Sequence, residues 1–326
     1  MNYESLSSEL LRALRGKRSQ TAFSKRLGYR SNVAYAWESG RAWPTALDFF
    51  GILERSGRKL EPALAAFFRV PAGATSASVK ADLKSAPGIA AFLDDLRGQT
   101  PVVDLARSAK RSRFAVARWL KGEAEPRLPD FLRLVECASL RVLDFLACFI
   151  DPNMLPSAAK IWRELETARR AAYEMPWSHA VLRVIELPAY RKLRAHEPGF
   201  IAERLGISRA EEERCIALLL ETGQLKKQAK RLIPGAALTV DTRGDAARSR
   251  QAKVFWTQVA LERIDSGALG TFSYNLFSVS RADLERIREL HRAYFRELRR
   301  IVAASEPAEC IALANVHLLE LGAGSA

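Results

Sequence analysis

One segment of this chain occurs twice, at a fixed offset of 82 positions and without a gap. Residues 14–54 return in this way, so that Trp37 recurs as Trp119 and Gly40 as Gly122. A constant offset means that one structural unit is used twice. The matched positions are framework residues, whereas the positions that would face a partner differ. This division favours two similar binding modules over a stacked solenoid.

Each copy predicts a bundle of five short helices. In the first copy, apolar residues at helical spacing stop at Gly16, Gly28 and Gly40, where helices are expected to end. Thr45 and Asp48 have the spacing of a capping box and begin a fourth helix, and a fifth helix completes the unit. The expected organisation is a helical domain over 1–70, a linker rich in small residues over 71–85, and a second helical domain over 86–150.

The remaining sequence predicts two further parts. Over 151–236, helical patterns lead to a short helix, a turn and a helix with Ser208 as N-cap, and then to a basic segment, 225–233, with hairpin periodicity; this combination is winged-helix-like. Over 237–326, Phe272 to Leu276 alternate as in a strand, Ser280 begins a long helix, and 311–319 is a second apolar strand pattern. The last part is therefore expected to be a small α/β module in a mainly α chain.

Charge suggests the kind of partner. The formal net charge is +14, and residues 1–150 carry 24 Lys and Arg against 15 Asp and Glu, compared with 27 against 22 in residues 151–326. An excess of this size attracts polyanions. The basic excess is greatest in the repeated half. An arginine-rich surface that is merely solvated is the alternative on charge alone.

The first copy resembles a known class of DNA-binding regulators. Leu27 and Gly28, the tryptophan nine residues later, Glu38 and Gly40 are similar to the phage-repressor-like (XRE-type) helix-turn-helix family over about 14–54. In that class the second helix of the pair enters the major groove. By this resemblance the base-facing residues are Ser31, Asn32 and Tyr35, and the phosphate-holding residues are Gln20, Lys25, Arg30 and Arg41.

Asn32 is the most informative of these residues, because an amide can pair in both directions with an adenine edge. The alternative is a helix-turn-helix scaffold that no longer binds DNA.

The second copy departs from the family at the turn. Lys110 replaces Gly28 and Leu120 replaces Glu38, so the geometry of the helix pair is in question. Arginine suits guanine edges and phosphates equally. DNA contact is expected here, against the alternative of a packing or dimerisation domain with a solvated basic face. The side chains expected at DNA are Arg111, Arg113, Arg118 and Lys121, beside Phe114.

The third helix pair predicts the opposite behaviour. Glu211, Glu212 and Glu213 stand where a recognition helix would meet phosphate, and three adjacent carboxylates would be repelled. Lysines on the basic segment that follows could still contact the DNA backbone, although a solvated charge run is an equal alternative. From about 160 to the end, the chain resembles a poorly characterised bacterial domain found behind helix-turn-helix heads. That resemblance implies a regulator and supplies no ligand.

Other classes find little support in the sequence. The four histidines are isolated, and there is no phosphate-binding glycine loop or nucleophile elbow, so an enzyme is a distant third possibility. No metal or cofactor is expected. The four cysteines are widely spaced and are expected to be reduced, buried, small hydrophobes. No apolar run could span a membrane, and the N-terminus lacks a secretory pattern, so a cytoplasmic protein is expected.

These observations together predict a bacterial transcriptional regulator that binds double-stranded DNA sequence-specifically, with repression favoured over activation. It is expected to act as a homodimer, with a C-terminal region for dimerisation, partner contact or sensing of a small-molecule or protein effector. The alternative from another class is a protein-interaction adaptor, such as an anti-repressor or an antitoxin, that uses the same scaffolds to bind protein.

Overall fold

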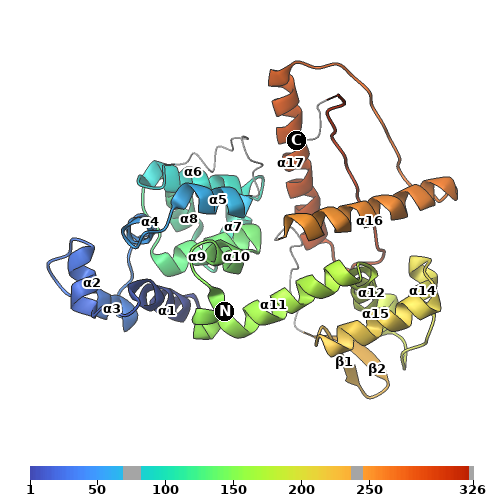
Figure 1. The fold of residues 1–326 in the computed structure, drawn as a ribbon, viewed down its shortest axis with the longest axis horizontal. Helices are drawn as coiled ribbons and strands as arrows, with labels where there is room; N and C mark the ends of the chain where they lie inside the picture. Colours follow the sequence, from blue (N-terminus) through green and yellow to red (C-terminus); the bar gives the residue numbers. More distant parts are fainter. Residues whose placement is uncertain (69–81, 236–244, 323–326) are drawn as a thin grey trace. The chain divides into compact units, whose positions relative to one another are not determined.

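The structure, a computed structural model, describes residues 1–68, 82–235 and 245–322 (Figure 1). It is mainly helical, as the sequence predicts, and the chain divides into two compact units, residues 1–163 and 164–326. Most of the expected linker, residues 71–81, lies outside the described residues. None of the helices in the described ranges is long and apolar enough to cross a membrane.

The first unit contains two sets of helices that follow the sequence repeat. The first set is α1 (Tyr3–Arg15), α2 (Gln20–Arg26), α3 (Val33–Glu38), α4 (Ala46–Arg55) and α5 (Leu60–Phe68). The second set is α6 (Ala86–Arg97), α7 (Val102–Ser108), α8 (Arg113–Leu120), α9 (Leu128–Ser139) and α10 (Val142–Ala147). Shifted by 82 positions, α2 coincides with α7, and the other helices overlap their counterparts over most of their lengths.

Phenylalanines dominate the core of this unit. Phe49 and Phe50 of α4, Phe92 of α6, Phe131 of α9 and Phe145 of α10 are all fully buried. Their neighbouring ring centroids are 5.5 to 6.5 Å apart, the range in which aromatic pairs attract. Because these rings come from both helix sets, the two sets share one hydrophobic core.

The second unit begins with a compact helical part. The helices η1 (Pro152–Met154) and α11 (Pro156–Glu174) lead the chain into it. Val184, Cys215 and Leu219 are among its buried core residues. The expected short helix, turn, helix and hairpin are confirmed here. The elements are α12 (Trp177–Glu186), α13 (Pro188–Arg191), α14 (Phe200–Leu205), α15 (Arg209–Glu221) and the antiparallel strands β1 (Leu225–Gln228) and β2 (Arg231–Pro234).

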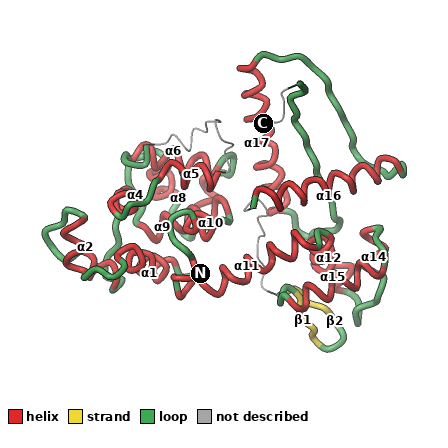
Figure 2. Tube along the Cα trace, in the orientation of Figure 1, coloured by secondary structure: helices red, strands yellow, loops and turns green. Residues whose placement is uncertain are grey.

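The terminal part differs from the expectation. It contains the long helices α16 (Ala246–Asp265) and α17 (Arg281–Ala304), but the strands expected at 272–276 and 311–319 are absent from the described chain. Residues 266–280 and 305–320 run as long loops instead (Figure 2). An apolar alternating segment becomes a strand only when another strand pairs with its backbone, and the described part of the chain supplies none. The expected α/β module is thus corrected to two helices and two unpaired segments.

Helix starts follow the capping residues that the sequence contains. Thr45 and Asp48 form a complete capping box, in which Asp48 N donates to Thr45 Oγ1 and Thr45 N donates to the Asp48 carboxylate, both at 3.1 Å. Ser208 caps α15 by accepting a hydrogen bond from Glu211 N, and Ser280 caps α17 by accepting one from Asp283 N, both at 3.1 Å. These short-range predictions are confirmed.

The cysteines are only partly as expected. None of the four forms a disulfide, but Cys215 is the buried one, Cys137 and Cys148 are half-buried, and Cys310 is exposed. Burial raises the pKa of the Cys215 thiol to about 12. Cys310 was expected to be buried, but it lies in the loop after α17 and is exposed.

Candidate nucleic-acid interface

The first candidate helix pair is α2 and α3. Ser19 caps α2 by accepting a hydrogen bond from Ala22 N at 3.1 Å. The turn passes through Gly28 with φ of +86°, a left-handed conformation that a glycine adopts without steric cost. Phe23 and Trp37 are buried between the helices and lock their crossing angle. The opposite side of α3 faces solvent and is accessible to a partner.

Most of the side chains predicted for DNA lie on this outer surface. Lys25, Arg30, Ser31, Asn32, Tyr35 and Arg41 are all exposed. The Arg41 guanidinium lies 5.1 Å from the centre of the Tyr35 ring, so these two residues form one surface feature. The structure therefore leaves these predicted residues accessible on and beside α2 and α3, and places Arg41 against Tyr35.

Asn32 has a structural task that sequence reasoning did not include. It is the N-cap of α3, and its Oδ1 accepts hydrogen bonds from Tyr35 N at 3.4 Å and Ser24 Oγ at 3.3 Å. The single Ser24 hydroxyl hydrogen is shared with the closer Gln20 carbonyl, at 2.8 Å, so the bond from Tyr35 N is the one that defines the cap. Pairing of Asn32 with an adenine edge would compete with the cap, whereas its Nδ2 amide group can still donate to an acceptor.

Glu38 ties the helix pair to α1. Its buried carboxylate accepts hydrogen bonds from Arg15 Nε at 2.6 Å and from Gln20 Nε2 at 3.0 Å. Burial alone would raise the pKa of Glu38, but the bonds from Arg15 and Gln20 outweigh it, and the pKa lies below its ordinary 4.5. Gln20, which was predicted to hold phosphate, is half-buried and donates one amide N–H to this carboxylate.

The second candidate helix pair is α7 and α8. Lys110 occupies the position of Gly28 and keeps a positive φ of 53°, so the turn is preserved although the glycine is lost. The doubt about the geometry of this pair is thereby removed. Ser112 caps α8 through Ala115 N at 3.1 Å. Starting at Arg113, α8 begins two residues earlier in the repeat than α3 does.

The outer surface of α8 is cationic and aromatic. Arg113, Arg118 and Lys121 are exposed, as predicted. Phe114 is 77% exposed, which is unusual for a phenylalanine, and the Arg113 guanidinium lies 5.8 Å from its ring centre. On the loop after α8, Lys121 Nζ lies 3.8 Å from Glu123 Oε1.

Arg111 has a different environment from the one predicted. Its Nε donates to Asp130 Oδ1 at 2.6 Å, and both side chains are partly buried, so the guanidinium links the turn to α9. In the first copy the equivalent residues are Tyr29 and Asp48, and Tyr29 OH donates to Asp48 Oδ1 at 3.3 Å. At the 82-residue offset Tyr29 aligns with Arg111 and Asp48 with Asp130, and this correspondence could have identified Arg111 as a structural residue.

The third helix pair, α14 and α15, corrects the interpretation of the acidic run. Glu212 is fully buried, and its carboxylate accepts hydrogen bonds from Gly199 N at 3.1 Å and Ala202 N at 2.6 Å, at the start of α14. Glu211 and Glu213 instead form surface ion pairs with Arg214 and Arg209. The run is therefore one buried cap, one half-buried carboxylate and one exposed carboxylate, the last two each paired with an arginine, and not a face of three repelling charges.

The hairpin after α15 carries the basic segment. Lys226, Lys227 and Lys230 are exposed. Arg231 is half-buried and donates to the backbone carbonyl of Arg191. Three of these four cations are therefore on the solvent side of the hairpin, and the fourth anchors it to the end of α13.

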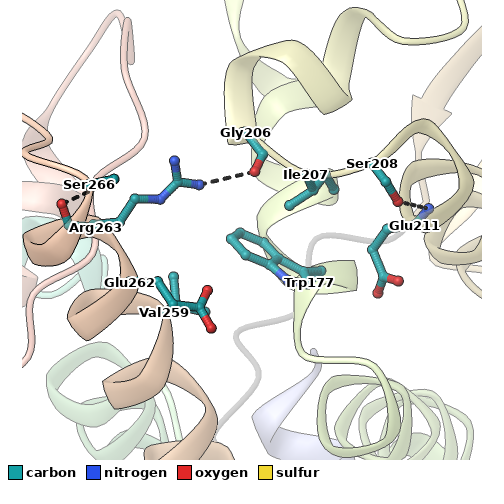
Figure 3. Close-up of a pocket in the computed structure, with 9 residues that line it drawn as sticks. All are labelled: Trp177, Gly206, Ile207, Ser208, Glu211, Val259, Glu262, Arg263 and Ser266. Atoms are coloured by element: carbon teal, nitrogen blue, oxygen red, sulfur yellow. Dashed lines mark hydrogen bonds between the residues drawn. The ribbon is translucent and has the colours of Figure 1, made fainter.

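A cavity of about 370 Å³ lies within the second unit, between the turn from α14 to α15 and helix α16 (Figure 3). Trp177 forms one wall, and the Arg263 guanidinium reaches across to the Leu205 carbonyl at 2.7 Å. Gly206, with φ of +60°, permits this approach, because a Cβ there would lie 2.7 Å from the guanidinium. With Glu211 and Glu262 also in its lining, the cavity could accept a small polar molecule.

A family model described as a domain of unknown function (DUF4423) matches residues 157–321. This stretch is just over half of the 326 residues, and the chain belongs to the DUF4423 family. The match agrees with the expected resemblance of the region from about 160 onward to an uncharacterised domain, and the two N-terminal helix sets lie outside it. No curated protein and no solved structure matches the chain.

Proposed function

We propose that this chain is a transcriptional regulator that binds double-stranded DNA sequence-specifically through its two N-terminal helix sets. One observation carries the proposal: in both sets, a helix that follows a short turn presents exposed donor and cationic side chains to solvent. The segment 14–54 also resembles the phage-repressor-like helix-turn-helix class, in which the equivalent helix enters the major groove. Repression is favoured over activation.

Charge supports the same partner. The exposed cations around α3 are Lys25, Arg30 and Arg41, and those on and beside α8 are Arg113, Arg118 and Lys121. Cations at such positions would neutralise phosphates, and their release of counterions makes binding weaken as salt rises, with a log–log slope near −0.9 for each phosphate contacted.

The test measures the affinity of the full-length chain for a site selected from random double-stranded DNA, and for unselected DNA, over a range of salt concentrations. Arg113→Ala with Arg118→Ala should weaken both affinities and flatten the salt slope to the extent that these side chains contact phosphate. If neither a selected site nor a salt slope is found with folded protein, the proposal is wrong.

Asn32 requires a matched pair of variants, because it also caps α3. Asn32→Ser keeps a capping oxygen and removes the amide, whereas Asn32→Ala removes both. If the amide reads a base, both variants should lose roughly 1–3 kcal/mol at the selected site and little on random DNA. If Asn32→Ser binds like the wild type, Asn32 is a cap and not a base-reading residue.

One observation favours a second candidate, a protein-interaction adaptor. Phe114 is 77% exposed and Tyr35 is 46% exposed, and exposed aromatic residues are typical of protein-contact sites. The two candidates differ in their response to salt, because an apolar protein contact would not show the steep loss expected for phosphate binding. Phe114→Ala should separate them, since an adaptor would lose its partner, whereas the phosphate-driven affinity for unselected DNA would change little.

We further propose that the second unit serves homodimerisation. Tyr274 is 97% exposed, Leu276 78% and Leu319 76%, and all three belong to the two segments that the sequence marks as strands. Unpaired strand-like segments seek a partner backbone, and a second copy of the chain offers matching ones. The cavity beside Trp177 is the candidate site for a small-molecule effector.

A further inference from the structure

The contact between the two N-terminal helix sets is symmetric at its centre. An isolated antiparallel bridge joins Thr45 and Arg127, which are equivalent residues of the repeat. Ala46 N donates to the Pro126 carbonyl at 2.9 Å, and Leu128 N donates to the Pro44 carbonyl, also at 2.9 Å. Each bond is the image of the other when positions are shifted by 82. Antiparallel pairing of equivalent residues defines a local two-fold axis.

The helices extend the same symmetry. Under the repeat, α1 corresponds to α6, α4 to α9, and α5 to α10. Between the sets, α1 contacts α9 and α4 contacts α6, and the repeat converts the first contact into the second. The other two contacts, α4 with α9 and α5 with α10, each join equivalent helices. Such reciprocal contacts define an isologous interface, the kind that forms in two-fold dimers. Here both halves belong to one chain.

This interface is a hydrophobic core and not a loose contact. Phe49 and Phe131 are equivalent residues whose ring centroids are 6.5 Å apart, and Phe50 lies 5.5 Å from Phe131. All three are fully buried. Separating the two sets would expose these rings to water, so their mutual orientation is held by the packing of the first unit.

Helix α3 contacts α1 and helix α8 contacts α6, so the candidate reading helices occupy equivalent places in the two sets. Helix α3 ends at Glu38, seven residues before Thr45, and α8 ends at Leu120, seven residues before Arg127. Seven residues span at most about 25 Å. Half-sites one turn of DNA apart have centres about 17 Å from a two-fold axis, which is within that reach.

We propose that one chain reads two half-sites of opposite polarity, one through α3 and the other through α8. The inference rests on the proposed DNA binding and adds the orientation of the site. Two domains in tandem would be free to read a direct repeat, whereas a two-fold pair requires an inverted arrangement. The half-sites differ in sequence, because Asn32 of the first copy corresponds to Phe114 of the second.

The first experiment uses DNA. A site is selected from random double-stranded DNA with the full-length chain and footprinted, and the chain is then offered that site, the same site with one half reversed, and the site with five base pairs inserted between the halves. Both altered sites should bind more weakly by on the order of a hundredfold, since one helix loses its contacts. Equal affinity for the reversed site would overturn the inference. Failure to select any site would count against DNA binding itself.

The second experiment fixes the relative orientation of the two helix sets with a disulfide. Thr45 and Arg127 form a non-hydrogen-bonded antiparallel pair, whose Cα atoms are typically about 4.5 Å apart, within the range of a disulfide. The double variant Thr45→Cys, Arg127→Cys is made in a Cys310→Ser background, and each single variant serves as its control.

Oxidation should give an intrachain disulfide, detected by mass spectrometry of peptides, and DNA affinity within about twofold of the reduced protein. A tenfold or greater loss on oxidation, with the helical circular dichroism signal unchanged, would show that the two sets reorient on DNA and would overturn the inference. Failure of the two thiols to pair would also contradict it.

Discussion

Equivalent residues of the two copies meet the same structural requirement with different chemistry. Gly28 and Lys110 both have positive φ at the turn between paired helices. Tyr29 and Arg111 both link that turn to an aspartate on the helix that follows. A side chain with a Cβ is strained in the left-handed region, by roughly 1–2 kcal/mol per residue, and glycine is not. The second copy therefore keeps the shape of the turn at a cost to its own stability.

This difference predicts opposite effects of two substitutions. Lys110→Gly should stabilise the α7–α8 pair by about 1 kcal/mol, because the strain is relieved, whereas Gly28→Ala should destabilise the α2–α3 pair by about that amount. Native-state hydrogen exchange of the helix amides in the full-length protein measures both effects. An unchanged or faster exchange in α7 and α8 of Lys110→Gly would contradict the strain argument.

The Glu38 carboxylate predicts an acid-sensitive link between α1 and α3. Its pKa is lowered in the folded state, so the stability it contributes is present above pH 4.5 and is lost as the pH falls through the lower folded value. Glu38→Gln should lower the free energy of unfolding by about 2 kcal/mol near neutral pH, and the variant should lack the decrease in stability that the wild type shows below pH 4.5. Hydrogen exchange of the α1 and α3 amides between pH 3 and about 6 measures this pH dependence in the wild type and the variant.

The control for Glu38 lies in the second copy. Arg97, the counterpart of Arg15, pairs with Asp94, which is exposed. Asp94→Asn should change stability by less than about 0.5 kcal/mol, because surface ion pairs contribute little. A loss as large as that of Glu38→Gln would show that burial is not what makes the Glu38 network strong.

At the scale of elements, a single buried carboxylate organises the α14–α15 pair. Glu212 projects from the first turn of α15 and satisfies the backbone N–H groups of Gly199 and Ala202, which the start of α14 leaves without helical partners. The acidic run is therefore a connection between two helices.

Removal of this charge should loosen both helices together. Glu212→Gln should lower the free energy of unfolding of this part by about 2 kcal/mol, because bonds to a charged acceptor are stronger than bonds to an amide. Glu213→Gln, at an exposed pair, should change it by less than about 0.5 kcal/mol. Thermal unfolding of the full-length variants, followed together with hydrogen exchange of α14 and α15, makes the comparison; equal effects would refute the capping role.

At the scale of the whole molecule, the apolar surface of the terminal part is the largest departure from a self-contained fold. The apolar side of α17 is covered at Leu284 but not at Tyr294 or Ile301, which are 47% and 53% exposed. Large apolar side chains left exposed along one side of a helix favour an interaction site there. The proposed homodimer would cover it.

Charges placed in the unpaired segments should therefore keep the chain monomeric. Tyr274→Lys with Leu276→Lys should lower the mass in sedimentation equilibrium from a dimer to a monomer, because two lysines would be buried at the interface. Met154→Lys, an equally drastic change at a residue 61% exposed in the first unit, is the matched control and should leave the mass unchanged. A wild-type chain that is monomeric at micromolar concentration would contradict the homodimer.

Features with short-range causes could be predicted from the sequence. The repeat, the helical class, the capping box at Thr45 and the cap at Ser280 depend on periodicity and on hydrogen bonds that span only a few residues. The exposure of Arg113, Arg118 and Lys121 also followed from the helical pattern. For these features the amino-acid order contains the whole physical argument.

Tertiary structure decided the features that depend on distant partners. Nothing local distinguishes Glu212 from Glu213, and only packing against the start of α14 makes Glu212 a buried capping charge while Glu213 stays in an exposed ion pair. The segments 272–276 and 311–319 have strand periodicity, but a strand needs a second backbone, which the sequence of one segment cannot specify. The two-fold relation of the helix sets likewise arises where Thr45 meets Arg127, because symmetry is a property of the contact between repeats and not of either repeat alone.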